Sequence, residues 1–278
     1  MKLSDRINKI ILYAIIIVGG LLTIIPFLWM FVLSTHTTAE IFRFPPPLLP
    51  GTHIIDNFQN LLKAMPFFTS LWNSIFVSTV HTALVLLFCS MAGYAFAMYN
   101  FPGRNFLFSA CLATMMIPWM AGIVPWFMLM KWFGWIDSFL ALIVPNVANA
   151  FGIFWMRQYI SSNVPYELLD ASRIDGCPEW QIFFRVVAPV LKPAISALGI
   201  MTFVRSWNNF MVPLIILKSP NKLTLPVALN KIYGDPTRGY DLGVLLMGTT
   251  LAVLPMLIVF VLSARKFMDG MTAGAVKG

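Results

Sequence analysis

The sequence contains few charged residues and few cysteines. Only 11% of its 278 residues are charged, while 59% are hydrophobic, which is not the composition of an ordinary soluble domain. The three cysteines, Cys89, Cys111 and Cys177, are odd in number and lack metal-type spacing, so neither a disulfide framework nor a zinc site is indicated. The scarcity of charge therefore predicts a membrane protein.

Sequence motifs for common enzyme chemistry are also missing. Gly234 and Gly239 have the glycine spacing of a phosphate-binding loop, but Tyr240 and Asp241 stand where such a loop needs lysine and then serine or threonine. The sequence has no HExxH pair, no nucleophile elbow and no carboxylate pair inside an apolar stretch. We therefore expect no enzyme activity and no cofactor on this chain.

Six apolar stretches are long enough to cross a bilayer, which requires about 20 residues of helix. Only the fifth contains a charged residue, Arg205. A helix satisfies its backbone hydrogen bonds internally, so the chain is expected to be an all-α, multi-pass membrane protein. The predicted spans are 10–33, 75–98, 106–130, 138–156, 194–217 and 242–264.

Basic residues flank the first stretch, since Lys2, Arg6 and Lys9 precede it. Lysine and arginine accumulate on the cytoplasmic side of membrane proteins, so both termini and the short loop at Arg104 are predicted to be cytoplasmic. The net charge of +8 comes from single residues at the ends of spans and not from a patch. This pattern favours contact with anionic lipid headgroups over contact with nucleic acid.

Prolines occur within the predicted spans. A proline removes a helix hydrogen bond, and in a bilayer the freed carbonyl must find a partner in protein or water. Spans interrupted this often are typical of a packed bundle with a polar or mobile interior. The prolines are Pro26, Pro118, Pro125, Pro145, Pro213 and Pro255.

The internal connection 157–192 is too polar and too interrupted to cross the membrane. Acidic residues stand early in a first helix, where the helix dipole favours negative charge, and Gly176 can take the left-handed conformation that ends it. Pro178 starts a second helix, which Pro189 is expected to close. Both helices are about half as long as a span, so the segment is predicted to lie on the cytoplasmic face.

The same segment resembles the "EAA" loop of bacterial ABC importer permeases. The family pattern is EAA, three residues, glycine, nine residues and then Ile-x-Leu-Pro. This chain keeps the spacing throughout and replaces four of the letters by residues of similar size. The corresponding residues are Asp170, Ala171, Ser172, Gly176, Val186, Ala188 and Pro189.

Three further stretches resemble the carbohydrate-uptake branch of that family and bring nearly the whole chain under the resemblance. They are FVRSWNNFMVPLIIL at 203–217, LTLPVAL at 223–229 and GMTAGAVKG at 270–278. The chain is most similar to the second permease subunit of maltose-type and other oligosaccharide importers. The resemblance implies a type I ABC importer permease fold: one transmembrane domain over 1–278, with six transmembrane helices and a cytoplasmic coupling helix.

The resemblance also implies a function and partners. In this family the coupling helix sits in a cleft of a separate ATPase subunit, and closure of the ATPase dimer moves the membrane helices between inward-open and outward-open states. The chain would import a di- or oligosaccharide across the bacterial cytoplasmic membrane with a second homologous permease, two ATPase subunits that bind ATP and Mg, and an extracytoplasmic solute-binding protein. The expected coupling residues are Glu167, Leu168, Asp170, Ala171, Ser172, Arg173 and Gly176.

Other interpretations stay open at this point. The charged segment could rest on lipid headgroups as an amphipathic helix pair. The chain could also be an ATP-independent secondary transporter or channel, or an ABC permease for a non-sugar solute such as glycerol phosphate. Ion coupling in a secondary transporter favours acidic residues or histidines inside the spans, where this chain has only His81.

A polar cluster is predicted within the fifth span. Placing Arg205 at the centre of a membrane costs about 2.5–3.5 kcal/mol, so it requires a water-filled cavity or a partner. Asn208 and Asn209 follow three and four residues later and are expected to share its helix face. This stripe could bind sugar hydroxyls or pack against another helix. The candidate translocation residues are Arg205, Asn208, Asn209, Asn146 and Asn149.

Overall fold

The chain folds into helices joined by turns. The computed structural model describes residues 3–233 and 241–272, and within these residues it contains no strand. The all-helical prediction is therefore confirmed for this part of the chain. Lys2, Gly234, Gly239 and the last six residues of the carboxyl-terminal motif lie outside the described residues.

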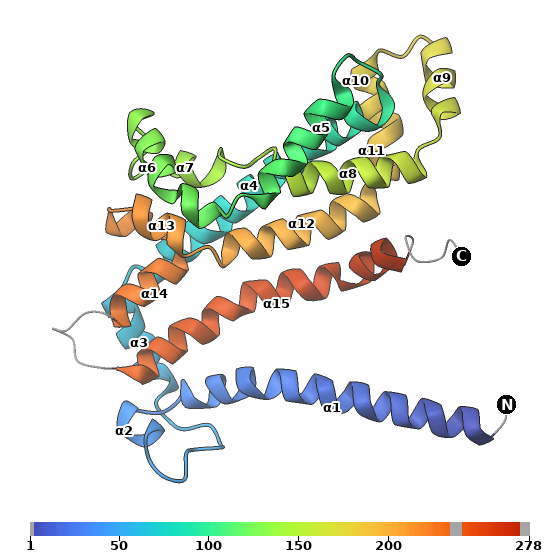
Figure 1. The fold of residues 1–278 in the computed structure, drawn as a ribbon. Helices are drawn as coiled ribbons and strands as arrows, with labels where there is room; N and C mark the ends of the chain where they lie inside the picture. Colours follow the sequence, from blue (N-terminus) through green and yellow to red (C-terminus); the bar gives the residue numbers. More distant parts are fainter. Residues whose placement is uncertain (1–2, 234–240, 273–278) are drawn as a thin grey trace. The chain divides into compact units, whose positions relative to one another are not determined.

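The helices vary widely in length (Figure 1). Those of nine residues or more are α1 (Leu3–Leu33), α3 (Ile54–Ala64), α4 (Phe67–Met98), α5 (Arg104–Ala113), α6 (Ile123–Trp132), α8 (Ala150–Asn163), α9 (Tyr166–Ile174), α12 (Lys192–Trp207), α14 (Leu225–Tyr233) and α15 (Leu242–Thr272). The shorter ones are α2 (Thr38–Ile41), α7 (Leu140–Ile143), α10 (Glu179–Gln181), α11 (Ala188–Val190) and α13 (Met211–Ile216). The 3-10 turns are η1 (Thr114–Met116), η2 (Trp119–Gly122) and η4 (Pro220–Lys222), and η3 (Ile182–Val187) is a π-helical turn.

Three single helices are long and apolar enough to cross a membrane: α1, α4 and α15. They cover the predicted spans 10–33, 75–98 and 242–264. The other three predicted spans, 106–130, 138–156 and 194–217, are not single continuous helices. Two pairs of helices are long and apolar enough only when taken together, and each pair is bent, by 92° between 104–116 and 119–132 and by 81° between 179–190 and 192–207. In the predicted span 138–156, α7 ends at Ile143 and α8 begins only at Ala150.

Prolines account for most of these interruptions. Ile117 precedes Pro118 and is extended, with ψ 118°, because the proline ring disfavours helical backbone in the residue before it. Pro125 and Pro213 stand in the first turns of α6 and α13, where no helix hydrogen bond is lost. Pro145 lies between α7 and α8. Within continuous helices lie Pro26 in α1 and Pro255 in α15.

The chain forms two compact units, residues 1–68 with 228–255 and residues 69–227 with 256–278. In the first unit, buried Asn57 ties α3 to the end of α1. Its amide nitrogen donates to the carbonyl oxygens of Ser34 at 2.8 Å and of His36 at 2.9 Å. The first residue of α15 is attached to the same unit, because the backbone nitrogen of Leu242 donates to the Thr38 hydroxyl at 2.8 Å.

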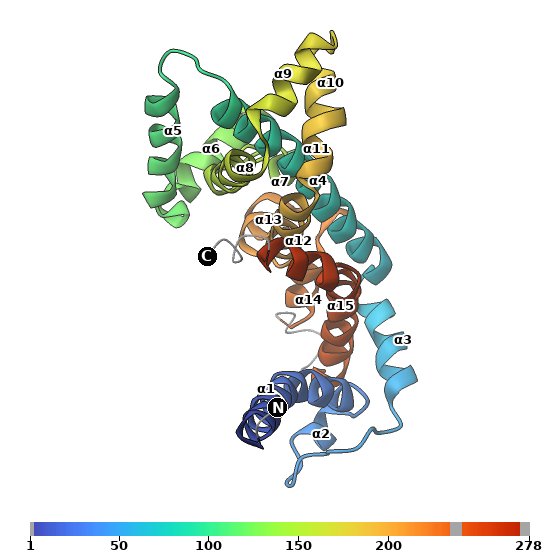
Figure 2. The same ribbon diagram turned by 90° about the vertical axis from the view of Figure 1, so that its right-hand side faces the viewer.

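The second unit contains a large apolar core. Side chains from α4, α8, α9, η3 and α12 build it, and α8 and α12 pack side by side (Figure 1). Figure 2 shows the same elements from a second direction, again with α9 and α10 next to each other at one end of this unit. The buried core residues of α8 are Ile153, Met156 and Ile160.

Two glycines allow α4 and α8 to cross closely. A Cβ atom added to Gly93 of α4 would lie 2.7 Å from the Met156 Cβ and 2.8 Å from the Arg157 backbone nitrogen. A Cβ atom added to Gly152 of α8 would lie 2.6 Å from the Cys89 sulfur. Helices in membranes associate through small residues of this kind, because close backbone approach maximises van der Waals contact.

Asp137 joins two distant segments of the second unit. Its Oδ1 accepts hydrogen bonds from the backbone nitrogens of Lys218 at 2.9 Å and Ser219 at 3.0 Å, and its Oδ2 accepts one from the Ser219 hydroxyl. The Lys222 ammonium lies 3.3 Å from Oδ2. The hydrogen bonds from Ser219, followed by that from Lys218, hold the pKa of the Asp137 carboxyl well below its usual range.

Asp137→Asn is expected to lower the melting temperature of the detergent-solubilised protein by about 2–4 °C at pH 7. A carboxyl whose pKa is depressed by folding stabilises the folded state above its unfolded pKa of about 3.9 and loses that contribution as the pH falls further. The difference between the two proteins should therefore shrink in thermal melts below pH 4. Equal melting temperatures at pH 7 would contradict the role given to this carboxylate.

Candidate functional site

The short helix α9 has a well-defined carboxyl end. As predicted, it ends before Gly176, whose φ of 78° lies in the left-handed region. The Gly176 backbone nitrogen donates to the Arg173 carbonyl at 3.0 Å, and that of Cys177 donates to the Ser172 carbonyl at 3.1 Å. These are the two hydrogen bonds of a Schellman motif, which stops the helix and turns the chain.

One side of α9 is fixed to the core of the second unit. Leu169 is completely buried and belongs to the same core as α4, α8 and α12. Ser172, one turn later, is also buried, and its hydroxyl donates to the Leu168 carbonyl at 2.8 Å. The Tyr166 hydroxyl donates to the Ala97 carbonyl at the end of α4 at 3.0 Å. Ser172 therefore packs inward and does not belong to an exposed contact surface.

The opposite side of α9 is exposed and carries most of the predicted coupling residues. Its members are three, four and seven positions apart, the spacing that places residues on one helix face. Ile174 is 86% exposed and adds an apolar side chain to this surface. We call this surface the outward face of α9; it comprises Glu167, Asp170, Ala171 and Ile174, with the partly exposed Leu168 at its edge.

Charged and aromatic side chains surround the last turn of α9. The Arg173 Nε donates to the Glu179 carboxylate at 2.8 Å, and its NH1 lies 3.2 Å from the Asp170 carboxylate. The hydrogen bond to Glu179 raises the pKa of the Arg173 guanidinium above its ordinary value. Burial, together with a hydrogen bond to Glu179, raises the pKa of the Tyr99 phenol. Both groups therefore keep their protons at neutral pH.

The segment after α9 differs from its prediction. Pro189 does not close the second helix, because α10, η3 and α11 run without interruption to Val190 and the chain bends at Leu191 before α12. Phe183 is buried with its ring centroid 5.4 Å from that of Tyr94 in α4. Trp180 and Phe184 are exposed, so one of the three aromatic residues anchors this helix to the core.

The predicted polar stripe on the fifth span is wrong in its geometry. Helix α12 ends at Trp207, so Arg205 is exposed in its last turn, Asn208 is the capping residue and Asn209 follows the end. The Asn209 side-chain oxygen accepts a hydrogen bond from the Val212 backbone nitrogen at the start of α13. The three side chains therefore do not share one continuous helix face.

A small polar cavity lies beside this break. Its volume is about 10 Å³, which is enough for one water molecule. The Thr224 hydroxyl is buried and has no hydrogen-bond partner among the described residues. Asn209 is the predicted translocation residue that lines the cavity. The polar lining residues are Ser74, Ser78, Ser206, Asn209 and Thr224.

The other polar candidates take part in local structure. Asn149 caps α8, since its side-chain oxygen accepts from the Gly152 backbone nitrogen at 2.9 Å and its amide donates to the Asn146 carbonyl at 3.2 Å. Asn146 has a φ of 65°, a left-handed conformation that asparagine tolerates. His81 forms a hydrogen bond with the Ile143 carbonyl at 2.8 Å.

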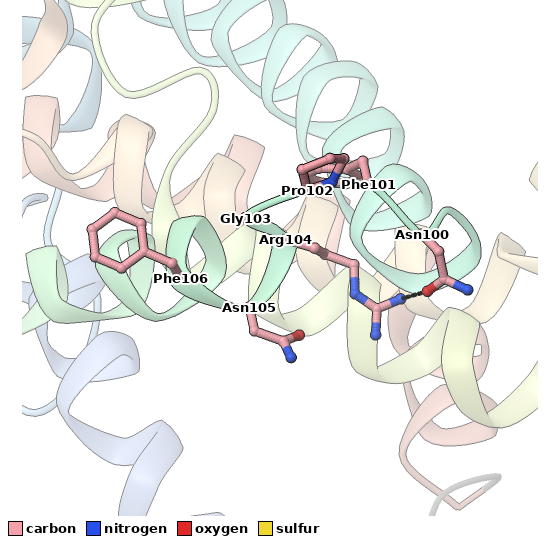
Figure 3. Close-up of a pocket in the computed structure, with 7 residues that line it drawn as sticks. All are labelled: Asn100, Phe101, Pro102, Gly103, Arg104, Asn105 and Phe106. Carbon is pink, nitrogen blue, oxygen red and sulfur yellow. Dashed lines mark hydrogen bonds between the residues drawn. The ribbon is translucent and has the colours of Figure 1, made fainter.

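The loop between α4 and α5 borders an open pocket of about 440 Å³ that residues 100–106 line. Figure 3 shows the Arg104 side chain reaching Asn100, while Phe106 points away from it. The Arg104 guanidinium donates to the Asn100 side chain at 2.9 Å and to the Tyr99 carbonyl at 3.2 Å. Arg104 thus closes the turn after α4 and fixes the position of Tyr99.

Comparison with known protein families identifies the family of this chain. The family described as "Binding-protein-dependent transport system inner membrane component" matches residues 89–271, which include α9 and most of the core that holds it. The chain belongs to this family. The permease is accordingly a multi-pass membrane transport protein, and the predicted ABC importer permease fold is confirmed.

Individual relatives extend the match to the full length of the permease. A lactose transport system permease protein of Rhizobium radiobacter is 36% identical over 275 residues, which cover 99% of this chain and 98% of the relative. An arabinooligosaccharides transport system permease protein of Halalkalibacterium halodurans is 37% identical over 260 residues, 92% of each chain. A chain in the crystal structure of a bacterial ABC transporter involved in the import of the acidic polysaccharide alginate matches with a TM-score of 0.82 and 25% identity, covering 96% of the permease and 99% of that chain.

Sequence reasoning missed four residues at this site. Ile174 extends the spacing of Glu167, Asp170 and Ala171 by one more turn, so its place on the outward face was readable from the sequence. Leu169, Tyr99 and Glu179 were not readable in this way, because their partners lie in other helices.

Proposed function

We propose that the permease is the membrane subunit of an ABC importer for an oligosaccharide. Relatives that cover nearly its whole length are named for the transport of lactose and arabinooligosaccharides. The similar solved transporter is described as importing an acidic polysaccharide. Sugar chains are thus the substrate class that these likenesses support, and the permease does no covalent chemistry on them.

The importer requires further subunits. The sequence has no phosphate-binding loop, so ATP and Mg bind on two separate ATPase subunits. A second, homologous permease completes the transmembrane path, and an extracytoplasmic solute-binding protein delivers the sugar. The chain crosses the bacterial cytoplasmic membrane six times, with α7 and α8 together as the fourth crossing, and both termini are cytoplasmic.

The outward face of α9 is the contact for the ATPase subunit. Its exposed Ala171 and Ile174 offer an apolar centre between two acidic residues, Glu167 and Asp170, as a short helix that docks in a cleft requires. The observation that carries this assignment is the burial of Leu169 on the opposite side. Because α9 is anchored in the core, a force on the outward face reaches α4, α8 and α12.

Polar residues at the break between α12 and α13 serve the translocation path. Arg205 and Asn208 are exposed at the end of α12, and Asn209 lines the polar cavity. Their amide and guanidinium groups can bind sugar hydroxyls. Asn146 and Asn149 contribute by setting the start of α8, which lies next to α12.

Reconstitution of the complete transporter tests this function. Proteoliposomes containing both permeases and the ATPase subunits should take up sugar only with internal ATP and the external solute-binding protein, and uptake should stop with a hydrolysis-deficient ATPase subunit. Sugar uptake by vesicles that hold the permease without any ATPase subunit would instead establish a secondary transporter or channel.

A further inference from the structure

We propose that Arg173, Glu179 and Tyr99 form a latch that fixes the carboxyl-terminal half of α9 to the end of α4, so that motion of α9 is delivered to α4. The latch deepens the proposed coupling function and rests on it. These three residues are positioning residues: they do not provide the outward face, and they hold the helix that does.

The latch connects three separate segments. Arg173 belongs to the last turn of α9, Glu179 begins α10, and Tyr99 directly follows α4. One Glu179 oxygen accepts from the Arg173 Nε at 2.8 Å, while the other accepts from the Tyr99 hydroxyl, 80 residues away in the sequence. The Arg173 guanidinium carbon also lies 6.0 Å from the centroid of the Tyr99 ring. Both carboxylate oxygens of Glu179 are therefore used.

Tyr99 is itself held in place, which lets it act as a fixed point. Its carbonyl accepts a hydrogen bond from Arg104 at 3.2 Å. Its ring meets the edge of the Tyr94 ring with centroids 5.4 Å apart, and Tyr94 in turn contacts the buried Phe183 at 5.4 Å. Tyr99 thus connects the latch, through Tyr94 and Phe183, to the aromatic part of the core.

The latch is needed at the carboxyl end of α9, where the last side chains of the helix are exposed. The hydrogen bond of Tyr166 secures the start of the helix, and the burial of Leu169 and Ser172 holds its inner side as far as the last turn. After Ser172 the chain is exposed as far as Gly176, and a Cβ added to Gly176 would meet no atom within 4 Å. Between the buried Ser172 and Cys177, which packs against the core, no side chain is buried, so the latch supplies the polar attachment of this end of α9 to the end of α4.

The same geometry predicts a separation between folding and coupling. The ion pairs of Arg173 are partly exposed, with side chains 39% exposed for Arg173 and 48% for Glu179. Pairs with this exposure contribute little to folding stability. Loss of the latch should therefore leave the protein folded and the ATPase subunit bound, while less of the ATPase motion is converted into movement of α4.

The test is the number of sugar molecules transported per ATP hydrolysed by the complete transporter in proteoliposomes. Arg173→Gln and Glu179→Gln should each lower this ratio about fivefold, the lower end of usual coupling effects, with ATPase subunits still copurifying. Arg185→Gln is the matched control, because Arg185 is exposed in η3 and forms no ion pair among the described residues.

An unchanged ratio in Arg173→Gln and Glu179→Gln would overturn the latch. The double variant Y99F/E179Q is a second test: it retains the ring and the side-chain volume, and it should also lower the ratio in an assembled transporter. Failure of the underlying coupling function would look different, because Ala171→Arg would then leave the ATPase subunit bound and sugar uptake intact.

Discussion

Replacing Ala171 by arginine should weaken binding of the ATPase subunit to the permease about 100-fold, a loss of about 2.7 kcal/mol of binding free energy, and should lower sugar uptake with it. Ala171 is exposed in the middle of the outward face, between Asp170 and Ile174. An arginine there would fill the space that a partner cleft needs and would bury a charge, a change of hot-spot size. Copurification of the ATPase subunit with the tagged permease measures the loss directly.

The matched control is Asn105→Arg, which adds the same side chain at an exposed position in the first turn of α5. This variant should retain the ATPase subunit and most of the uptake. Equal loss in both variants would mean that an added positive charge is harmful in itself. Full retention of the ATPase subunit by Ala171→Arg would remove the outward face of α9 from the interface.

Replacing Gly93 by valine should prevent the permease from accumulating in a folded form. The valine Cβ would lie 2.8 Å from the Arg157 backbone nitrogen, so that α4 and α8 must move apart because no side-chain rotation relieves the contact. Overpacking of this kind costs about 3 kcal/mol, and the core shared by the two helices would lose further contacts. The yield of monodisperse protein in mild detergent is the measurement.

Gly19→Val provides the comparison, since a Cβ at Gly19 of α1 meets no atom within 4 Å. It makes the same chemical change within an apolar helix, so its yield of folded permease should stay near that of the original chain. A normal yield and a normal melting temperature for Gly93→Val would show that α4 and α8 do not cross as closely as described.

The sequence predicted the long apolar helices better than the interrupted ones. An apolar composition indicates that a stretch is shielded from water. It does not distinguish one straight helix from two short helices that meet at an angle. Pro118 and Pro145 lie where the helical structure is interrupted, whereas α1 runs through Pro26 without a break. The local sequence does not distinguish these cases, because in a membrane the carbonyl freed by a proline must find a partner in protein or water.

At the functional site, the helix and its end were predictable, and its attachments were not. Gly176 marks the end of α9 because few other residues adopt its backbone conformation without strain. Leu169, by contrast, is one of many leucines, and its burial depends on α4 and η3. The stripe expected from Arg205 to Asn209 failed because α12 ends at Trp207, in front of Asn208.

Photo-cross-linking from position 174 tests the central claim most directly. A benzophenone amino acid in place of the exposed Ile174 should, in the active transporter, form an adduct whose mass equals the permease plus one ATPase subunit. The same amino acid in place of Asn105 should give little of that adduct. An active transporter in which position 174 cross-links only to lipid, while the ATPase subunit is captured from another part of the permease, would contradict the role of α9 as the coupling helix.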